Sequence, residues 1–132
     1  MKPQRWLAGA TLVLSLVVVR PAAAEDLGGD PTQGQELWTR AGLQDPDRGG
    51  RRSCTTCHGQ DPRQPGRHAT TGKVIPPMAP VALPSRFSDA AHREKWFLRN
   101  CKWTLGRECS AAEKANVLAY LNSLTVMGGG KE

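Results

Sequence analysis

The segment Cys54-Thr55-Thr56-Cys57-His58 is the feature that most restricts what this chain can fold into. Two cysteines separated by two residues and followed at once by histidine have the spacing that attaches haem c covalently. Each thiol adds across one haem vinyl group, and the neighbouring imidazole is carried to one side of the iron, where its neutral form is a good axial ligand. In such a fold we expect the haem to occupy the centre of the domain.

Two other uses of this cysteine pair fit the chain less well. A thioredoxin-like pair belongs beside a strand–helix–strand pattern, which the sequence lacks. A zinc site would need a second close pair of ligands, whereas Cys101 and Cys109 lie eight residues apart. A simple disulfide between Cys54 and Cys57 would give His58 no role. We therefore expect one covalently attached haem c, bound through Cys54, Cys57 and His58.

The first 24 residues have the pattern of a secretory signal peptide. Lys2 and Arg5 precede an apolar run over 6–19, and three alanines close the segment at Ala24. A spanning helix needs about 20 apolar residues, and this run is shorter, so the pattern favours a removed signal over a membrane anchor. We expect the mature chain to begin after Ala24, to lack a transmembrane segment and to be periplasmic.

Removal of that segment changes the charge balance. The whole chain has 18 Lys+Arg and 12 Asp+Glu, a net charge of +6, and three of the basic residues lie within 1–24. The mature chain therefore keeps 18 − 3 = 15 basic against 12 acidic residues, a net charge of +3. The longest basic run is Arg51-Arg52, so there is no basic stripe of the kind that binds nucleic acid. We expect no nucleic-acid partner, and only weak docking to an acidic protein face.

Periodicity predicts three short helices, over about 30–42, 88–101 and 110–124. The first begins at Asp30-Pro31, a typical N-cap and first helical residue, and has Gly42 as its natural stop. The third begins at Ser110, which forms a capping box with Glu113. No convincing alternating strand pattern appears, so the predicted fold class is all-α.

Long loops join these helices. Residues 59–87 contain six prolines and cannot form a long helix, so an extended loop is expected there. The chain has only seven aromatic residues, and three short helices would be marginally stable alone, so an apolar group should fill the centre. We expect one haem-binding domain over 25–125 and a flexible, glycine-rich tail over 126–132.

Cys101 and Cys109 bracket the predicted turn between the second and third helices. In an exported protein the simplest interpretation is a disulfide, which would fix the end of the second helix. Two free buried thiols are the alternative.

The sixth iron ligand has several candidates. Asn100 is i+4 from Trp96 and i+3 from Phe97, so it projects from the predicted apolar face of the second helix, which also contains Cys101. An unpaired buried amide costs about 1–3 kcal/mol. Asn100 could therefore cap its own helix end, bind the iron or hydrogen-bond an iron-bound ligand. The other candidates are Met78 in the proline-rich loop, His68 and His92, for which a packing or surface role is the simpler explanation, and Met127 in the tail.

From Ser53 to about Leu121 the chain resembles the SHP-type cytochromes c, oxygen-binding monohaem cytochromes with an asparagine axial ligand. The most specific match is Arg99-Asn100-Cys101 followed by Cys109. Further matches are Ser53-Cys-Thr-Thr-Cys-His-Gly59, Thr71-Gly-Lys73, Ile75 with Pro77, Ala79-Pro80, Arg86-Phe87, Glu94-Lys-Trp96, Gly106-Arg107 and Glu113-Lys-Ala115, with a weaker match back to Gly34.

The resemblance implies a small class I-like cytochrome c fold, with three or more short helices and long loops around one covalent haem c. The site residues it implies are Cys54 and Cys57 for haem attachment, His58 as proximal ligand, Asn100 as distal ligand in the ferric state, and Cys101–Cys109 as a disulfide beside it.

The resemblance also implies that the asparagine leaves the iron on reduction and exposes a site for O2, NO or CO. Electrons would come from a dihaem cytochrome c or a membrane b-type cytochrome. The related cytochromes c″ have a detachable histidine instead, so Asn100 favours the SHP type. Two alternatives stay open: a plain electron carrier with a permanent Met or His ligand, and an enzyme that reduces or detoxifies O2, peroxide or NO.

Five residues depart from the family pattern: Met78, Lys102, Trp103, His68 and His92. Met78 stands where leucine is expected, and Lys102 and Trp103 replace smaller polar residues just after the distal segment. Lys102 or Trp103 could alter access to the distal side of the haem. Met78 brings a methionine close to the haem region, and His68 and His92 could compete as iron ligands.

Overall fold

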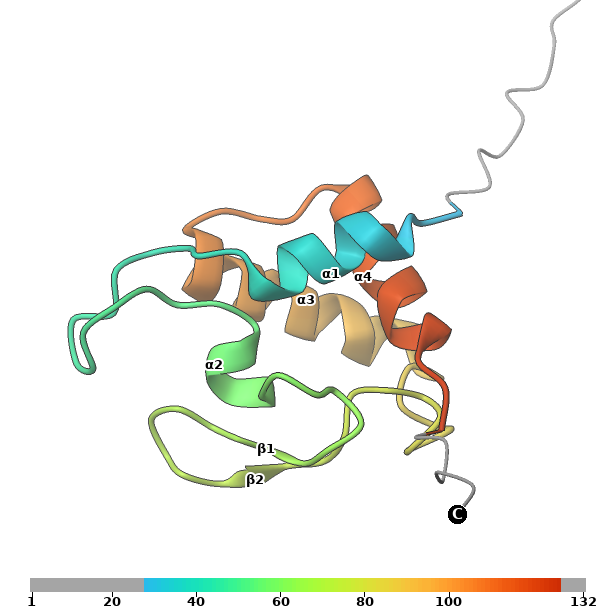
Figure 1. Cartoon of the computed structure of the whole chain (residues 1–132). Helices are drawn as coiled ribbons and strands as arrows, with labels where there is room; N and C mark the ends of the chain where they lie inside the picture. Colours follow the sequence, from blue (N-terminus) through green and yellow to red (C-terminus); the bar gives the residue numbers. More distant parts are fainter. Residues whose placement is uncertain (1–27, 127–132) are drawn as a thin grey trace, which may run out of the picture.

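The computed structural model describes residues 28–126. The predicted signal peptide over 1–24 and all but the first residue of the predicted tail over 126–132 lie outside the described residues. In chain order the elements are α1 (Pro31–Thr39), α2 (Thr55–His58), β1 (Gly66–Arg67), β2 (Val74–Ile75), α3 (Ala90–Leu105) and α4 (Ala111–Ser123) (Figure 1). The predicted all-α class is confirmed, and no helix in the described range is long and apolar enough to cross a membrane.

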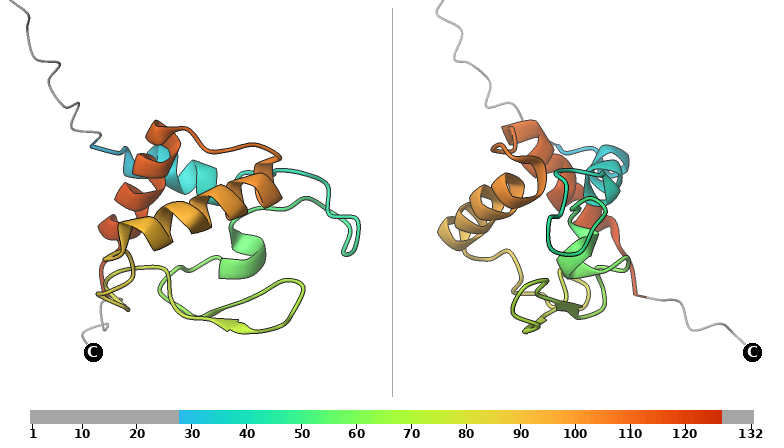
Figure 2. Two further views of the ribbon diagram at one scale, coloured as in Figure 1. Left: turned by 180° about the vertical axis from the view of Figure 1, so that it is seen from behind. Right: turned by 90° about the vertical axis from the view of Figure 1, so that its left-hand side faces the viewer.

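The core forms where α1 packs against α4. Leu37 and Trp38 of α1 are buried with Val117, Tyr120 and Leu121 of α4. The ring centroids of Trp38 and Tyr120 lie 6.2 Å apart. Helical spacing within each segment put these side chains on one face, and the two faces bury each other. Figures 1 and 2 show α2 and the β1–β2 hairpin on one side of the layer made by α1, α3 and α4.

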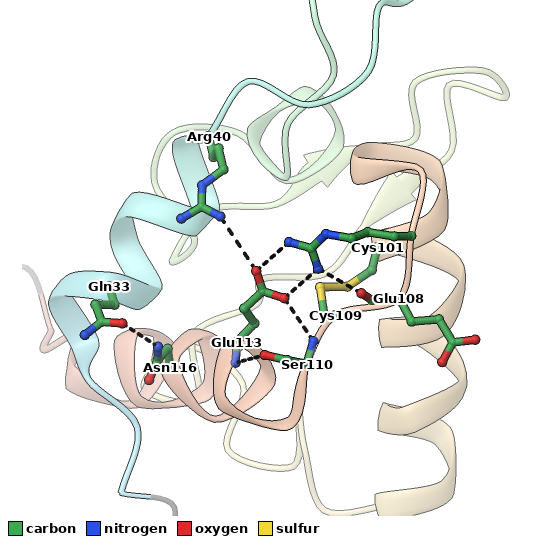
Figure 3. Close-up of polar contacts among 9 residues, drawn as sticks. Gln33, Arg40, Cys101, Glu108, Cys109, Ser110, Glu113 and Asn116 are labelled. Atoms are coloured by element: carbon green, nitrogen blue, oxygen red, sulfur yellow. Dashed lines mark hydrogen bonds and ion pairs between the residues drawn. A yellow bond between two sulfur atoms is a disulfide. The ribbon is translucent and has the colours of Figure 1, made fainter.

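Gly34 lets α1 and α4 approach closely. A Cβ at this position would collide with the carbonyl oxygen of Asn116 and would lie 2.7 Å from the Cβ of Tyr120. Asn116 bridges the same crossing, because its Oδ1 accepts from the Asp30 N–H at 2.8 Å. Its Nδ2 also donates to Gln33 at 3.2 Å, as Figure 3 shows. The start of the domain is thereby fixed to its last helix.

Two helix ends differ from the sequence prediction. α1 stops at Thr39, because Arg40 is already extended, and Gly42 instead allows close contact with the Thr104 carbonyl. α3 runs about one turn beyond the predicted end at Asn100 or Cys101. It ends only at Gly106, which adopts the left-handed conformation, with φ 75°, that glycine permits at a helix C-terminus.

The proline-rich loop contains one short hairpin. β1 and β2 pair antiparallel, with Gly66 opposite Ile75 and Arg67 opposite Val74. The expectation of no strand was wrong here, because a ladder of two residues per strand leaves no alternating pattern in the sequence. After the hairpin, the backbone N–H groups of Met78 and Ala79 both donate to the carbonyl of Pro62, which closes the loop on itself.

Glu113 joins the end of α1, the segment between α3 and α4, and the start of α4 (Figure 3). Its carboxylate accepts two hydrogen bonds of 2.8 Å from Arg107 and one of 2.9 Å from the Ser110 N–H, which completes the predicted capping box of α4. Arg40, at the end of α1, lies 3.7 Å away. Hydrogen bonds from Arg107 and Ser110, with the charges of Arg107 and Arg40, hold the pKa of Glu113 at about 2, although partial burial opposes them.

We expect Glu113→Gln to remove part of the acid sensitivity of the fold. The pKa of Glu113 is lower in the folded state than its ordinary value of 4.5, so its contribution is full above that pH and is lost as the pH falls toward about 2. The variant should be about 1 kcal/mol less stable at pH 7, with a shallower decline below pH 4.5. Urea unfolding between pH 3 and 7 measures this. Glu36→Gln, an exposed change on α1, is the control, and an equal loss in both variants would contradict the assignment.

Candidate haem site

The cysteine–histidine motif forms the single turn of α2. Cys54 immediately precedes this turn, Cys57 and His58 lie within it, and Gly59, with φ 74°, ends it. Ahead of the turn, the Ser53 N–H donates to the Thr56 hydroxyl at 3.0 Å. The motif residues are therefore held together by local geometry, and both thiols are free.

His58 is enclosed and uncharged. Its ring centroid lies 5.5 Å from that of Trp38, whose indole N–H donates to the Gly59 carbonyl at 3.3 Å. Burial, and then the charge of Arg86, lower the pKa of His58 to about 4, so the imidazole is neutral at neutral pH. Its Nδ1 is buried without a hydrogen-bond partner among the described residues. A neutral imidazole is the form that coordinates a metal.

The two thiols have different surroundings. Cys54 packs against the α1–α4 core, and burial raises its pKa to about 11. The sulfur of Cys57 accepts from the Ala69 N–H at 3.3 Å, which joins α2 to the hairpin. Gly66 of β1 allows this approach, since a Cβ there would collide with the Cys57 carbonyl and lie 2.8 Å from the Cα of His58. The hairpin thus supports the back of the attachment turn.

α3 buries a narrower stripe than the sequence indicated. Phe97 packs against the core, and Cys101 and Thr104 are 6% and 5% exposed. Trp96 is 40% exposed and Asn100 is exposed, so both lie on the flank beside that stripe. The proposal that Asn100 caps its own helix is wrong, because α3 continues to Leu105. No side-chain hydrogen bond of Asn100 is found within residues 28–126.

The expected disulfide is present. Cys101 and Cys109 are bonded, with their Cα atoms 5.6 Å apart (Figure 3). Cys109 immediately precedes Ser110, the N-cap of α4. The alternative of two free buried thiols is therefore wrong, and the bond ties the C-terminal part of α3 to the start of α4.

The other candidate ligands have contacts of their own. Nδ1 of His68 accepts from the N–H groups of Thr70 and Thr71 at 3.3 and 3.1 Å. His92 is exposed at the start of α3, with its ring 6.0 Å from Trp96. The remaining candidates are Met78, whose sulfur accepts from Nη2 of Arg86 at 2.8 Å, and Met127, which lies outside the described residues.

Lys102 and Trp103, which depart from the family pattern shortly after Asn100, differ in their surroundings. Lys102 is exposed and pairs with Glu108 at 3.4 Å. Trp103 is covered by the guanidinium of Arg52, 4.4 Å from the ring centroid, and its carbonyl accepts from the same group. Both side chains thus contact other residues of this domain: Lys102 contacts Glu108, and Trp103 contacts Arg52.

Sequence reasoning missed two residues beside His58. Arg86 is part of a family match in the sequence, and no sequence signal singles out Trp38. Neither carries a local signal, because Trp38 and Arg86 lie 20 and 28 positions from His58 in the sequence, and the ring contact of Trp38 and the charge effect of Arg86 arise only through the fold. The free thiols and the neutral, partly unpartnered imidazole of α2 fit a covalently attached haem c.

Comparison with known proteins agrees with this fit. Residues 24–121 match the family described as Domain of unknown function (DUF1924). The solved structure of oxidized SHP, an oxygen-binding cytochrome c, superposes with a TM-score of 0.65 at 43% identity and covers 73% of this chain and 83% of that one. The chain is an SHP-type cytochrome c of this family. One covalently attached haem c is therefore its cofactor, as the attachment motif predicted.

Further relatives place this SHP-type cytochrome c beside the cytochromes c″. Cytochrome c-type protein SHP of Cereibacter sphaeroides is 54% identical over 69 residues, 52% of this chain and 53% of the relative. Cytochrome c″ of Methylophilus methylotrophus is 44% identical over 69 residues, 52% and 48% of the two chains. The matches thus span about half the length of these curated relatives. The oxidized cytochrome c″ structure superposes with a TM-score of 0.66 at 36% identity, covering 75% of this chain and 79% of that one.

Proposed function

We propose that this protein is an exported, periplasmic monohaem cytochrome that transfers electrons and binds O2, NO or CO at the iron when reduction releases Asn100. The observation that supports it is the position of Asn100. It is an exposed amide without a capping role, on the flank of α3, next to a disulfide-bonded cysteine. Export is consistent with that disulfide, because oxidising compartments preserve such bonds.

Cys54 and Cys57 would hold the haem through thioether bonds, and His58 would bind the iron on the proximal side. When bound, the haem supplies a redox-active iron with one position left for exchange. Trp38 and the hairpin keep His58 in place, and burial keeps its imidazole neutral and able to coordinate. These residues form the fixed half of the site.

Asn100 would form the changeable half. An amide oxygen is a weak, hard ligand, which tolerates ferric iron and binds softer ferrous iron poorly. Once released, its NH2 group can donate a hydrogen bond to a diatomic ligand. The disulfide limits the movement of the helix end, since Cys101 is both buried and bonded to Cys109. Release must therefore come mainly from rotation of the Asn100 side chain.

A plain electron carrier with a permanent sixth ligand is less well supported. The sulfur of Met78 is engaged by Arg86, and Nδ1 of His68 is engaged by its own turn. His92 is exposed at the far end of α3 from Asn100. The proposed electron donors are a dihaem cytochrome c or a membrane b-type cytochrome, and the small net charge of +3 after removal of 1–24 favours weak, transient docking.

Visible and EPR spectra of both oxidation states, with CO added to the reduced protein, test the proposal. We expect a six-coordinate ferric haem, and a high-spin ferrous haem that binds CO and O2. A low-spin ferrous haem that does not react with CO would rule out the open site. Rapid catalytic turnover of NO or peroxide with a reduced partner would instead identify an enzyme, and electron exchange alone a carrier.

A further inference from the structure

Among residues 28–126, Arg86 is a half-buried cation without a carboxylate partner. Within residues 28–126, the other half-buried basic side chains each lie within 4.0 Å of an Asp or Glu oxygen. The remaining basic residues without such a pair are exposed: Arg51, Arg67, Lys73, Lys95 and Arg99. Arg86 therefore combines burial with the lack of a neutralising charge.

That combination is unfavourable unless an anion is supplied. Burial lowers the pKa of Arg86, which reflects the cost of holding its charge away from water. Within residues 28–126, its side-chain hydrogen bond goes from Nη2 to the sulfur of Met78, at 2.8 Å. A thioether is a weak, uncharged acceptor, and a guanidinium has five N–H donors. The contact thus uses one of the five N–H donors of the guanidinium and leaves its positive charge without a neutralising partner.

Arg86 also lies close to the haem site. Its guanidinium contacts Met78, and Met78, Cys54 and Phe87, the residue next to Arg86, all pack against the α1–α4 core. The partner that Arg86 lacks should therefore be an anion present beside α2. Haem brings two such groups, its propionate carboxylates.

We infer that Arg86 binds one haem propionate through its guanidinium. The planar fork of arginine matches the two oxygens of a carboxylate, and the pair would neutralise two charges that are each costly in this half-buried place. The remaining donors leave the contact with Met78 possible. This inference rests on the proposed haem attachment at Cys54 and Cys57, but not on the release of Asn100. Arg86 would position the haem edge without touching the iron.

NMR titration of the propionates in the haem-loaded protein tests this inference. In the unmodified protein, one propionate should remain ionised down to about pH 4 while the other titrates at higher pH. Arg86→Gln should raise the pKa of that one propionate by about one unit or more. Arg86→Lys, which keeps the charge but loses the fork, should fall between the two. Arg51→Gln removes the same charge from an exposed position and should change neither propionate.

Several results would overturn the inference. Identical titration of both propionates in the unmodified protein would overturn it. This measurement remains decisive if Arg86→Gln accumulates no haem-loaded protein. An equal effect of Arg86→Gln and Arg51→Gln would show a general charge effect. If Arg86→Gln left the pKa values of both propionates unchanged, the anion paired with Arg86 would not be a propionate. The CO test remains separate, because propionate titration does not depend on whether the reduced iron is open.

Discussion

Replacement of Asn100 by alanine is expected to change the ferric visible and EPR spectra, and to tighten azide binding by the ferric protein about tenfold or more. An internal ligand that occupies the iron most of the time lowers the apparent affinity of any external ligand by the fraction left free. Removing the amide removes that competition. In the reduced protein, O2 should dissociate about fivefold faster, because one hydrogen bond worth about 1 kcal/mol is lost.

Asn122→Ala is the matched control for this variant. Asn122 is also exposed and helical, and its amide donates to the Leu118 carbonyl at 2.8 Å on α4. Its removal should leave the spectra and azide binding unchanged. Unaltered ferric spectra in Asn100→Ala would move the sixth ligand to Met78, His68 or His92.

Loss of the disulfide is the second large effect that we expect. In the double variant Cys101→Ser with Cys109→Ser, the free energy of unfolding should fall by about 2–3 kcal/mol, as expected for a short loop closed over a separation of 8 residues. The same change loosens the backbone next to Asn100. The fraction of ferric protein with that ligand bound should therefore fall, which azide titration would detect.

Urea unfolding of the haem-loaded protein measures the stability change. Glu108→Ala, within the same loop and exposed, is the control and should cost less than about 0.5 kcal/mol. If the double variant matched this control, the bond would contribute nothing to the folded state. If its stability fell while azide binding stayed constant, the disulfide would stabilise the fold without restraining Asn100.

Local signals in the sequence were reliable. The Asp30 cap and the Ser110–Glu113 capping box both formed, because each depends on residues within one helical turn. The attachment motif is equally local, and it predicted the haem c.

Features that depend on distant contacts were not predictable. Nothing in the local sequence distinguishes Gly42 from Gly106 as a helix end. Only Gly106 of the two ends a helix, because Gly42 is needed for close contact with Thr104. The exposure of Trp96 likewise depends on how α3 is turned against the core. The effect of the Arg86 charge on His58 also depends on the path of a loop, which the prolines limit but do not define.

The packing of α1 against α4 at Gly34 determines when this domain can complete its folding. Asp30 and Asn116, which join the two helices, are 86 positions apart, and the attachment motif lies between them. A contact of such long sequence separation forms late, after the last helix has emerged. Until then the thiols of Cys54 and Cys57 belong to an open chain and are accessible for haem attachment. Covalent attachment can thus precede folding, and the haem then becomes the template on which the two ends of the chain meet.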